Sequence, residues 1–353
     1  MSFLSHFSEV TDPRTQINVQ HDFIDVIFLT VSAVLSGAEG WSDIEVFGRD
    51  KLDWLRQYRP FENGIPVDDT IARIVRVICP EQLNKAFMNW VNEVRVETGK
   101  PQIAIDGKTL RHSYDGDKQT ALHSITAWSK DAGLVLAQLK SSGKKNENAS
   151  VLDLLDTLNI KGALISADAM NSQKKIVEKI CSENADYVLC IKNNHKQLRD
   201  EIAAYFHKVE RDNPAWIACN EQTDSGHGRI EVRRCQQLRV SEWISEAQHW
   251  KGIRSVIKIE RERHLKDKEV STETQYYISS LDIDPAAVNQ AIRAHWEVEN
   301  KVHWVLDVTF KEDDSRIRKE DGAENVGVIR RSCLNIARLH PKKASMRSKL
   351  KMA

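Results

Sequence analysis

Three acidic residues stand next to apolar segments, and their chemistry is that of metal ligands. Asp106 follows the strand-like run Ile103–Ile105, and Asp168 follows the apolar run Ala163–Ala167. Glu299 falls on the apolar stripe of a predicted helix. Charged side chains rarely remain on core-facing positions unless they are paired or bind a metal. If folding brings these three carboxylates together, their oxygens suit Mg²⁺ or Mn²⁺.

The helix that carries Glu299 is predicted from its start signals and its periodicity. Asp284 and Pro285 have the residue types of an N-cap and a first helical position. One face then repeats at steps of three and four residues: Val288, Ile292, His295, Glu299, Val302 and Leu306. Glu299 lies in the middle of this stripe, and Glu297 and Asp307 are its competitors for the third acidic position.

Each acid also has an ordinary structural explanation. Asp106 before Gly107 would serve in a turn, Asp168 would cap a helix, and Glu299 would pair with a buried cation. Any one of these acids alone would favour the structural explanation, and the occurrence of all three favours the site. A zinc hydrolase is an alternative, because residues 295, 299 and 303 (His, Glu, His) are spaced four apart. The two strand-end aspartates favour Mg²⁺ or Mn²⁺ instead.

The elements that must position these acids alternate between strand and helix. Strand-like runs and amphipathic helices follow one another over residues 102–106, 122–129, 134–140, 148–158 (helix), 163–168, 173–183 (helix), 187–192 and 195–209 (helix). The order β-β-β-α-β-α-β-α predicts an α/β fold whose mixed sheet begins antiparallel and continues parallel. Sites in such sheets gather at the carboxyl ends of strands, where both aspartates are placed.

The flanking regions differ in charge and in predicted structure. Residues 1–99 read as four helices, at 22–35, 42–58, 68–78 and 80–97, with a Ser42–Glu45 capping box opening the second. This region carries 15 acids against 9 Lys and Arg, so DNA reading competes with helix packing or dimerisation as its role. From residue 325 onward there are eight Lys and Arg and no acid. That tail predicts contact with a polyanion, or a solvated segment.

Composition excludes several classes of protein. The 353 residues carry no formal net charge, and 29% of them are charged. They contain no apolar run long enough for a membrane span, and the first residues do not have the pattern of a signal peptide. The six cysteines are scattered without a C-x-x-C pair, which argues against zinc knuckles and disulfides. We therefore expect a protein of the reducing cytoplasm with no membrane partner.

Five motifs together carry a family resemblance: residues 105–108 (IDGK), 167–169 (ADA) with Gln173, 226–229 (GHGR), 295–300 (HWEVEN) and 303–308 (HWVLDV). As an ordered set they resemble the ISAs1 family of DDE transposases, in the IS4-like group, which includes the H-repeat-associated transposases of enteric bacteria. The resemblance covers nearly the whole chain. It implies an RNase H-like mixed sheet with flanking helices, a β-rich insertion and an all-α N-terminal domain. The implied domains are 1–99 (helical), 100–209 (first part of the core), 210–280 (insertion), 281–325 (closing helix) and 326–353 (basic tail).

The resemblance implies that Asp106, Asp168 and Glu299 are the catalytic and metal-binding triad. The implied reaction is two-metal phosphoryl transfer with Mg²⁺ or Mn²⁺, cleaving and transferring DNA strands at inverted-repeat ends. In the IS4-like signature Tyr, Arg, Glu and Lys surround this helix. Aligned on Glu299, the other three positions hold Ile292, His295 and Leu306, so the glutamate alone matches. A domesticated or remnant element, acting as a nuclease or only as a DNA-binding protein, is the alternative.

Double-stranded DNA, both element ends and target, is the expected partner, in a nucleoid-associated bacterial protein and possibly as a homodimer. Candidate phosphate contacts come from basic residues near the motifs, each of which also fits an ordinary surface cation. The expected DNA-binding residues are Lys108, Arg111, Lys192, His227, Arg229 and His295. Three tryptophans, at 128, 296 and 304, fit either base stacking or core packing.

Overall fold

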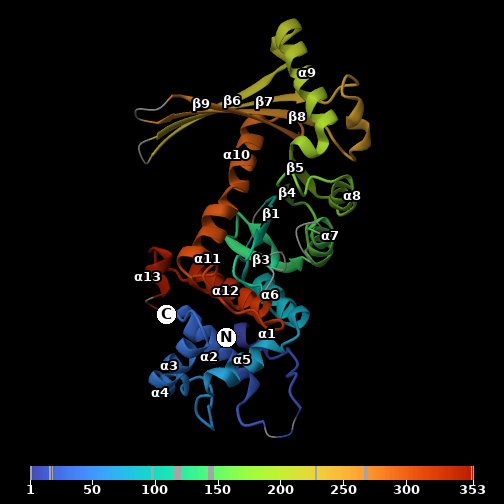
Figure 1. Ribbon diagram of the computed structural model, residues 1–353. Coiled ribbons are helices and arrows are strands. Elements are labelled where there is room, and N and C mark those ends of the chain that lie inside the picture. The colour runs from blue at the N-terminus through green and yellow to red at the C-terminus, as the bar shows by residue number, and fades with distance from the viewer. Residues whose placement is uncertain are drawn as a thin grey trace. The chain divides into compact units, whose positions relative to one another are not determined.

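The computed structural model describes residues 2–15, 17, 19–96, 99–114, 121–141, 147–226, 229–265, 269–350 and 352 (Figure 1). The chain forms two compact units, each assembled from separate segments. Unit 1 comprises Met1–Glu97, Gly107–Ser150 and Val298–Ala353, and unit 2 comprises Thr98–Asp106 and Val151–Glu297. Strand β1 (Gln102–Thr109) begins in unit 2 and ends in unit 1.

Unit 1 is mainly helical. Its helices are α1 (Ser2–Phe7), α2 (Phe23–Leu35), α3 (Trp41–Asp50), α4 (Leu52–Leu55), α5 (Asp68–Arg76), α6 (Pro80–Val94), α11 (Trp304–Val308), α12 (Gly322–Leu339) and α13 (Met346–Leu350). The hairpin of β2 (His123–Ser129) and β3 (Leu134–Ser141) is antiparallel, as predicted. The predicted helical N-terminal region is confirmed. Its first long helix begins where Asp22 accepts a hydrogen bond from the Asp25 backbone N–H at 3.0 Å.

The predicted capping box at Ser42 and Glu45 is wrong by two residues. Helix α3 begins at Trp41, and Asp43 accepts a hydrogen bond from the Gly40 backbone N–H at 3.1 Å. Glu45 instead accepts from the Asp68 backbone N–H at 2.7 Å, at the start of α5. The aspartate three residues after Gly40 satisfies an orphan N–H of the first turn, so the helix starts earlier than the serine suggested.

The segment predicted to begin a basic tail is a buried helix instead. Helix α12 packs against α2, α5, α6 and β3 within unit 1 (Figure 1). Arg330 and Arg331 lie on it and are buried. Arg338, near its end, lies 4.3 Å from the ring centre of the buried Trp128. Arg330 and Arg331 are therefore core residues, Arg338 is partly buried, and the other basic residues of the predicted tail follow the helix.

Unit 2 contains a mixed sheet. Its strands are ordered β1-β4-β5-β9-β8-β7-β6, parallel across β1, β4 and β5 and antiparallel across the rest. The elements are α7 (Glu147–Thr157, which starts in unit 1), β4 (Leu164–Ala167), α8 (Lys174–Ser182), β5 (Asp186–Ile191), η3 (Asn193–His195), α9 (Lys196–Asp212), η4 (Pro214–Trp216), β6 (Ala218–Gly226), β7 (Arg229–Arg239), η5 (Ser245–His249), β8 (Ser255–Leu265), β9 (Ser271–Ser279) and α10 (Pro285–His295). The predicted order of strands and helices through residue 209 is confirmed, and with it a mixed α/β fold.

The β-rich region after α9 continues this sheet. Strand β9 pairs with β5, so β6–β9 extend the parallel strands sideways. Helix α10 covers one face of these strands (Figure 1). Apolar side chains from β5, β7, β8 and α10, among them Val188, Cys235, Ile257 and Ile292, form the core between them.

The single long helix predicted from Asp284 onward is interrupted. Asp284 caps α10 as predicted, accepting from the Ala287 backbone N–H at 3.0 Å. The α-helix ends at His295 and is followed after a turn by a π-helical segment, η6 (Glu299–His303). A π-helix places more residues in each turn, so the apolar periodicity beyond this point no longer follows α-helical phase. Among the described residues, none of the helices combines the length and apolar character of a membrane span.

Candidate active site

The two aspartates predicted to form a site follow neighbouring parallel strand segments in unit 2. Strand β1 pairs with β4 so that Ile105 lies opposite Ala167. Asp106 and Asp168 are the next residues on each strand, and both are partly buried. Neighbouring strands lie about 4.8 Å apart, so both carboxylates belong to the same edge of the sheet. Strand β1 does not end at Asp106 as expected but continues to Thr109.

A tight turn after β4 fixes Asp168. Its Oδ1 accepts hydrogen bonds from the backbone N–H of Asn171 at 3.0 Å and from the Asn171 side-chain amide at 2.9 Å. The Ser172 hydroxyl donates to the Asp168 carbonyl at 2.9 Å, and both Asn171 and Ser172 are fully buried. Asp168 therefore closes a turn before α8, whose N-cap is Gln173. The carboxylate is held in place before any ligand arrives.

A second set of contacts supports this turn from the segment after β5. The Asn194 side-chain amide donates to the Ala169 carbonyl at 2.6 Å, and the His195 Nε2 lies 2.6 Å from the Ser172 carbonyl oxygen. Asn171, Asn194 and His195 were not among the residues predicted from the sequence. The spacing of Asp168 and Asn171 was the available signal, because an aspartate commonly bonds the backbone a few residues ahead in a turn.

Glu299 does not occupy the buried position predicted for it. Its side chain is 56% exposed, and Val298 takes the buried place in the stripe. The helix interruption and the π-helical turn account for the difference, because the predicted stripe assumed one regular α-helix. The Glu299 carboxylate lies 3.4 Å from Nδ1 of the buried His303. The carboxylates of Glu299 and Asp106 and the imidazole of His303 are each groups that can bind a metal ion. No single α-helix carries His295, Glu299 and His303, so the zinc alternative loses its regular spacing.

Lys108 points into a group of carboxylates, and this bears on the phosphate contact expected of it. Its side chain is 10% exposed and forms ion pairs with Asp307, with Glu312 at 3.1 Å and with Asp313 at 3.4 Å. Asp307, the competitor for the third acidic position, is thus paired with a lysine. Burial raises the pKa of Asp307, and Lys108 opposes that rise.

Glu312 connects this group to helix α12. Its carboxylate lies 2.7 Å from the Arg331 guanidinium, and both side chains are fully buried. Burial alone would raise the pKa of Glu312, but Arg331, Lys108 and Arg330 outweigh it and hold that pKa at about 2. Arg331 also donates to the Gly327 carbonyl at 3.1 Å. The buried charges of this cluster therefore compensate one another, which is the arrangement that makes buried ions tolerable.

A Thr–His–Glu chain, in which the histidine and the glutamate are buried, lies beside the residue after Asp106. Thr109 Oγ1 is 2.9 Å from His123 Nδ1, and His123 Nε2 is 2.9 Å from the Glu147 carboxylate. A Cβ on Gly107 would lie 2.6 Å from Glu147 Oε1 and 2.7 Å from His123 Nε2. Glycine at this position therefore lets the pair approach β1 closely. Sequence reasoning missed both His123 and Glu147.

The remaining expected DNA-binding residues lie in different surroundings. The Arg111 side chain is exposed and 3.2 Å from Asp313. Lys192 is exposed and follows β5, which runs parallel to β4, so it lies at the same sheet edge as Asp168. His295 ends α10 and is partly buried. His227 lies outside the described residues, and Arg229 begins β7 with its side chain outside them.

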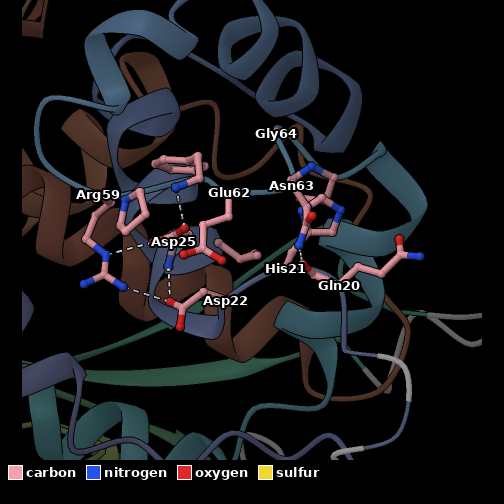
Figure 2. Close-up of a pocket in the computed structure, with 12 residues that line it drawn as sticks. Gln20, His21, Asp22, Asp25, Arg59, Glu62, Asn63 and Gly64 are labelled. Atoms are coloured by element: carbon pink, nitrogen blue, oxygen red, sulfur yellow. Dashed lines mark hydrogen bonds and ion pairs between the residues drawn. The ribbon is translucent and has the colours of Figure 1, made fainter.

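A pocket in unit 1 is formed by other residues and is not this site. Its volume is about 170 Å³, and it lies beside the start of α2 (Figure 2). Arg59 donates to Asp25 at 2.8 Å and to Asp22 at 3.0 Å, and the Phe61 backbone N–H donates to Asp25 at 2.9 Å. These contacts fasten the loop after α4 to α2, so the polar groups here have a structural role.

The fold and the two aspartates on neighbouring strands define an α/β protein with an acidic site at one edge of its sheet. A family model described as "Transposase DDE domain" matches residues 97–336, and one described as "DDE_Tnp_1-associated" matches residues 4–91. The chain belongs to the DDE transposase family, in the IS4-like group. The resemblance found in its motifs is thereby confirmed.

Relatives of similar length share two fifths of their residues with this chain. "H repeat-associated putative transposase YhhI" of Escherichia coli K12 is 42% identical over 340 residues, covering 94% of this chain and 89% of that protein. "Putative transposase YncI" of Escherichia coli O157:H7 is 40% identical over 347 residues, covering 96% and 87%. A short relative, "Inactive transposase YbfQ" of Escherichia coli K12, is 56% identical over 72 residues, covering 20% of this chain and 86% of that protein.

Proposed function

We propose that this protein is a metal-dependent DNA transposase that cleaves DNA strands at inverted-repeat ends and joins them to a target. The observation that carries the proposal is the placement of Asp106 and Asp168 after paired residues of β1 and β4, in a chain of the DDE transposase family. We assign Glu299 as the third acid. The order of strands and helices also supports an RNase H-like core for this fold.

The donor atoms at the sheet edge fit Mg²⁺ or Mn²⁺. Asp106 and Asp168 supply carboxylate oxygens from two neighbouring strands, and hard divalent cations prefer oxygen ligands. Asp168 is already oriented through Oδ1, which lowers the cost of arranging a metal site. In our proposal Asp106, Asp168 and Glu299 hold the metal. When bound, the metal would activate a water or a DNA 3′-hydroxyl and stabilise the charge of the phosphoryl group.

The protein residues have distinct parts in this proposal. Asn171 and Ser172 keep the Asp168 turn closed, and Asn194 and His195 hold that turn against the segment after β5. Lys192, exposed at the same sheet edge, is proposed to contact the phosphate backbone of double-stranded DNA, with Arg111, His227, Arg229 and His295 as further contacts. Lys108 has the weakest support of this group, because it is paired with three carboxylates. A homodimer that joins two DNA ends stays a prediction.

The test is a nicking assay on DNA that carries the inverted repeats flanking the gene. The wild-type protein should nick the repeat end with Mg²⁺ and be inactive with a chelator. Asp168→Asn should lower the nicking rate by at least about a thousandfold, since it removes a charge that stabilises the transition state through the metal. Asp153→Asn, an exposed aspartate on α7 in the same unit, is the matched control and should retain the wild-type rate.

A domesticated nuclease or a DNA-binding remnant is the second candidate. One relative, "Inactive transposase YbfQ", is 56% identical over 72 residues and is described as inactive. A nuclease would nick without producing joined strands, and a remnant would bind DNA without nicking it. Nicking by Asp168→Asn at the wild-type rate would refute the assigned site.

A further inference from the structure

Two buried arginines face each other on the strands that extend the sheet of unit 2. Arg233 on β7 and Arg261 on β8 are directly opposite in the antiparallel register. The exposed fraction is 8% for Arg233 and 6% for Arg261. Like charges placed opposite each other in a sheet repel, and burial removes the water that would screen them. Such a pair destabilises the folded protein unless an anion lies between or beside the two groups.

The described residues compensate this pair incompletely. Arg233 donates to Glu231 at 2.6 Å. Arg261 is also opposite Glu273 of β9 in the register, but among the described residues it forms no ion pair with that or any other carboxylate. Buried Nε and Nη1 of Arg233, and buried Nε and Nη2 of Arg261, have no hydrogen-bond partner in the described part of the chain. Burial lowers the pKa of Arg233, and the nearby charges of Arg261 and Arg293 lower it further. Buried donors normally have partners, so these orphaned groups point to a ligand.

An aromatic ring covers one side of the arginine pair. Trp296, just after α10, lies with its ring centre 5.3 Å from the Arg261 guanidinium, and this tryptophan is 42% exposed. Arg293, one turn earlier on α10, pairs with Asp224 of β6. The cationic groups therefore gather where the end of α10 meets the β7–β8 strands, with a partly exposed aromatic ring over Arg261.

We propose that Arg233 and Arg261 form a binding site for a phosphate group. Guanidinium groups bind phosphate oxygens through parallel hydrogen bonds, and one phosphate would neutralise both cations while satisfying the orphaned donors. The phosphate is either part of a DNA backbone or free in solution. The DNA source rests on the proposed function, whereas the site itself does not. Arg233 and Arg261 lie on β7 and β8, whereas Asp106 and Asp168 come from β1 and the residue after β4.

The first arm of the test measures the thermal unfolding of the full chain in sodium phosphate and in sodium chloride at equal ionic strength. Phosphate should raise the Tm of the wild type, since a ligand that binds the folded state stabilises it. Arg233→Gln and Arg261→Gln should lose that rise. Arg261→Lys, which keeps the charge, should restore part of it. Arg234→Gln, next along β7 with an exposed side chain, is the matched control and should keep the full rise.

The second arm measures binding of a short fluorescein-labelled DNA duplex over a range of salt concentrations. If the phosphate belongs to DNA, Arg261→Gln should bind about tenfold more weakly, and the slope of log K against log salt should fall by about 0.9. A Tm response that depends on both arginines, with unchanged duplex binding, supports the site with free phosphate as its ligand. The proposal is overturned if neither the phosphate-dependent rise in Tm nor duplex binding changes in Arg233→Gln or Arg261→Gln.

The two proposals fail separately. Asp168→Asn should lose nicking but keep the phosphate-dependent rise in Tm, because Asp168 is not part of the arginine pair. Loss of that rise in Arg261→Gln, in a protein that does not nick DNA, would uphold the phosphate site and reject the transposase activity.

Discussion

Unit 1 and unit 2 each bury arginine side chains, but they balance the charges differently. In unit 1, Arg331 pairs with Glu312 at 2.7 Å, and Glu312 also pairs with Lys108 at 3.1 Å. In unit 2, Arg261 faces Arg233 across the strands and forms no ion pair with a described carboxylate. Within the described part of the chain, two Arg331 nitrogens also have no hydrogen-bond partner, yet its charge is compensated by Glu312. A buried arginine therefore suggests a ligand when no neighbouring carboxylate neutralises its charge. Burial of the side chain alone does not suggest one.

The largest effect on stability should come from breaking the compensated cluster. Glu312→Gln leaves Arg331 and Lys108 buried without their shared carboxylate, which should cost about 3–5 kcal/mol of unfolding free energy. The midpoint of urea unfolding, followed by tryptophan fluorescence, measures this cost. Asp314→Asn, an exposed acid two residues later, should shift the midpoint little. If both variants unfold at the same urea concentration, the cluster does not stabilise unit 1.

Acid should weaken the same cluster in a defined pH range. Burial favours the neutral form of Glu312, but Arg331, Lys108 and Arg330 dominate and hold its pKa at about 2, below the ordinary 4.5. A lowered folded-state pKa means that the stabilisation is complete above pH 4.5 and is lost as the pH falls toward 2. The urea midpoint of the wild type should therefore fall over this range more steeply than that of Glu312→Gln. Parallel pH curves for the two proteins would show that Glu312 titrates normally.

A smaller effect is expected at the second buried pair of unit 1. In Gly107→Ala the new Cβ would lie 2.6–2.7 Å from Glu147 and His123, which are buried and have little room to move. We expect a cost of about 1–3 kcal/mol in unfolding free energy. Gly226→Ala, at the end of β6 with no atom of the described residues within 4 Å of the added Cβ, is the control. A midpoint equal to that of the control would mean that the Thr109–His123–Glu147 chain tolerates displacement.

Local patterns predicted most elements of the fold, because caps and periodicity depend on nearby residues. The Asp284 N-cap and the strand ahead of Asp168 illustrate this. Helix α12 was missed because its arginines were counted as surface charge, whereas Arg330 and Arg331 are buried. Their compensation depends on Glu312, from a different part of the chain. Net charge in a segment carries no information about such long-range pairing.

The candidate site also has a part that could be predicted from the sequence and a part that could not. Asp106 and Asp168 were predictable, since strand ends are visible in sequence and parallel strands align their ends. The environment of Glu299 was not, because a π-helical turn shifts the phase of the face and leaves no clear mark in the sequence. The pairing of Lys108 with Asp307, Glu312 and Asp313 joins residues some 200 positions apart, which no local pattern records.

The smallest effect on stability is expected at the incompletely compensated pair, Arg233 and Arg261, where the sign of the change in unfolding free energy tests the comparison. Arg261→Met removes one of two facing cations and replaces it with an apolar chain that fits a buried strand position. Without phosphate, unfolding free energy should stay unchanged or rise by about 1 kcal/mol, because a buried charge without a partner is unfavourable. Excess phosphate should reverse the order, stabilising the wild type alone. If Arg261→Met were destabilised as strongly as Glu312→Gln without phosphate, Arg261 would be a structural residue like Arg331.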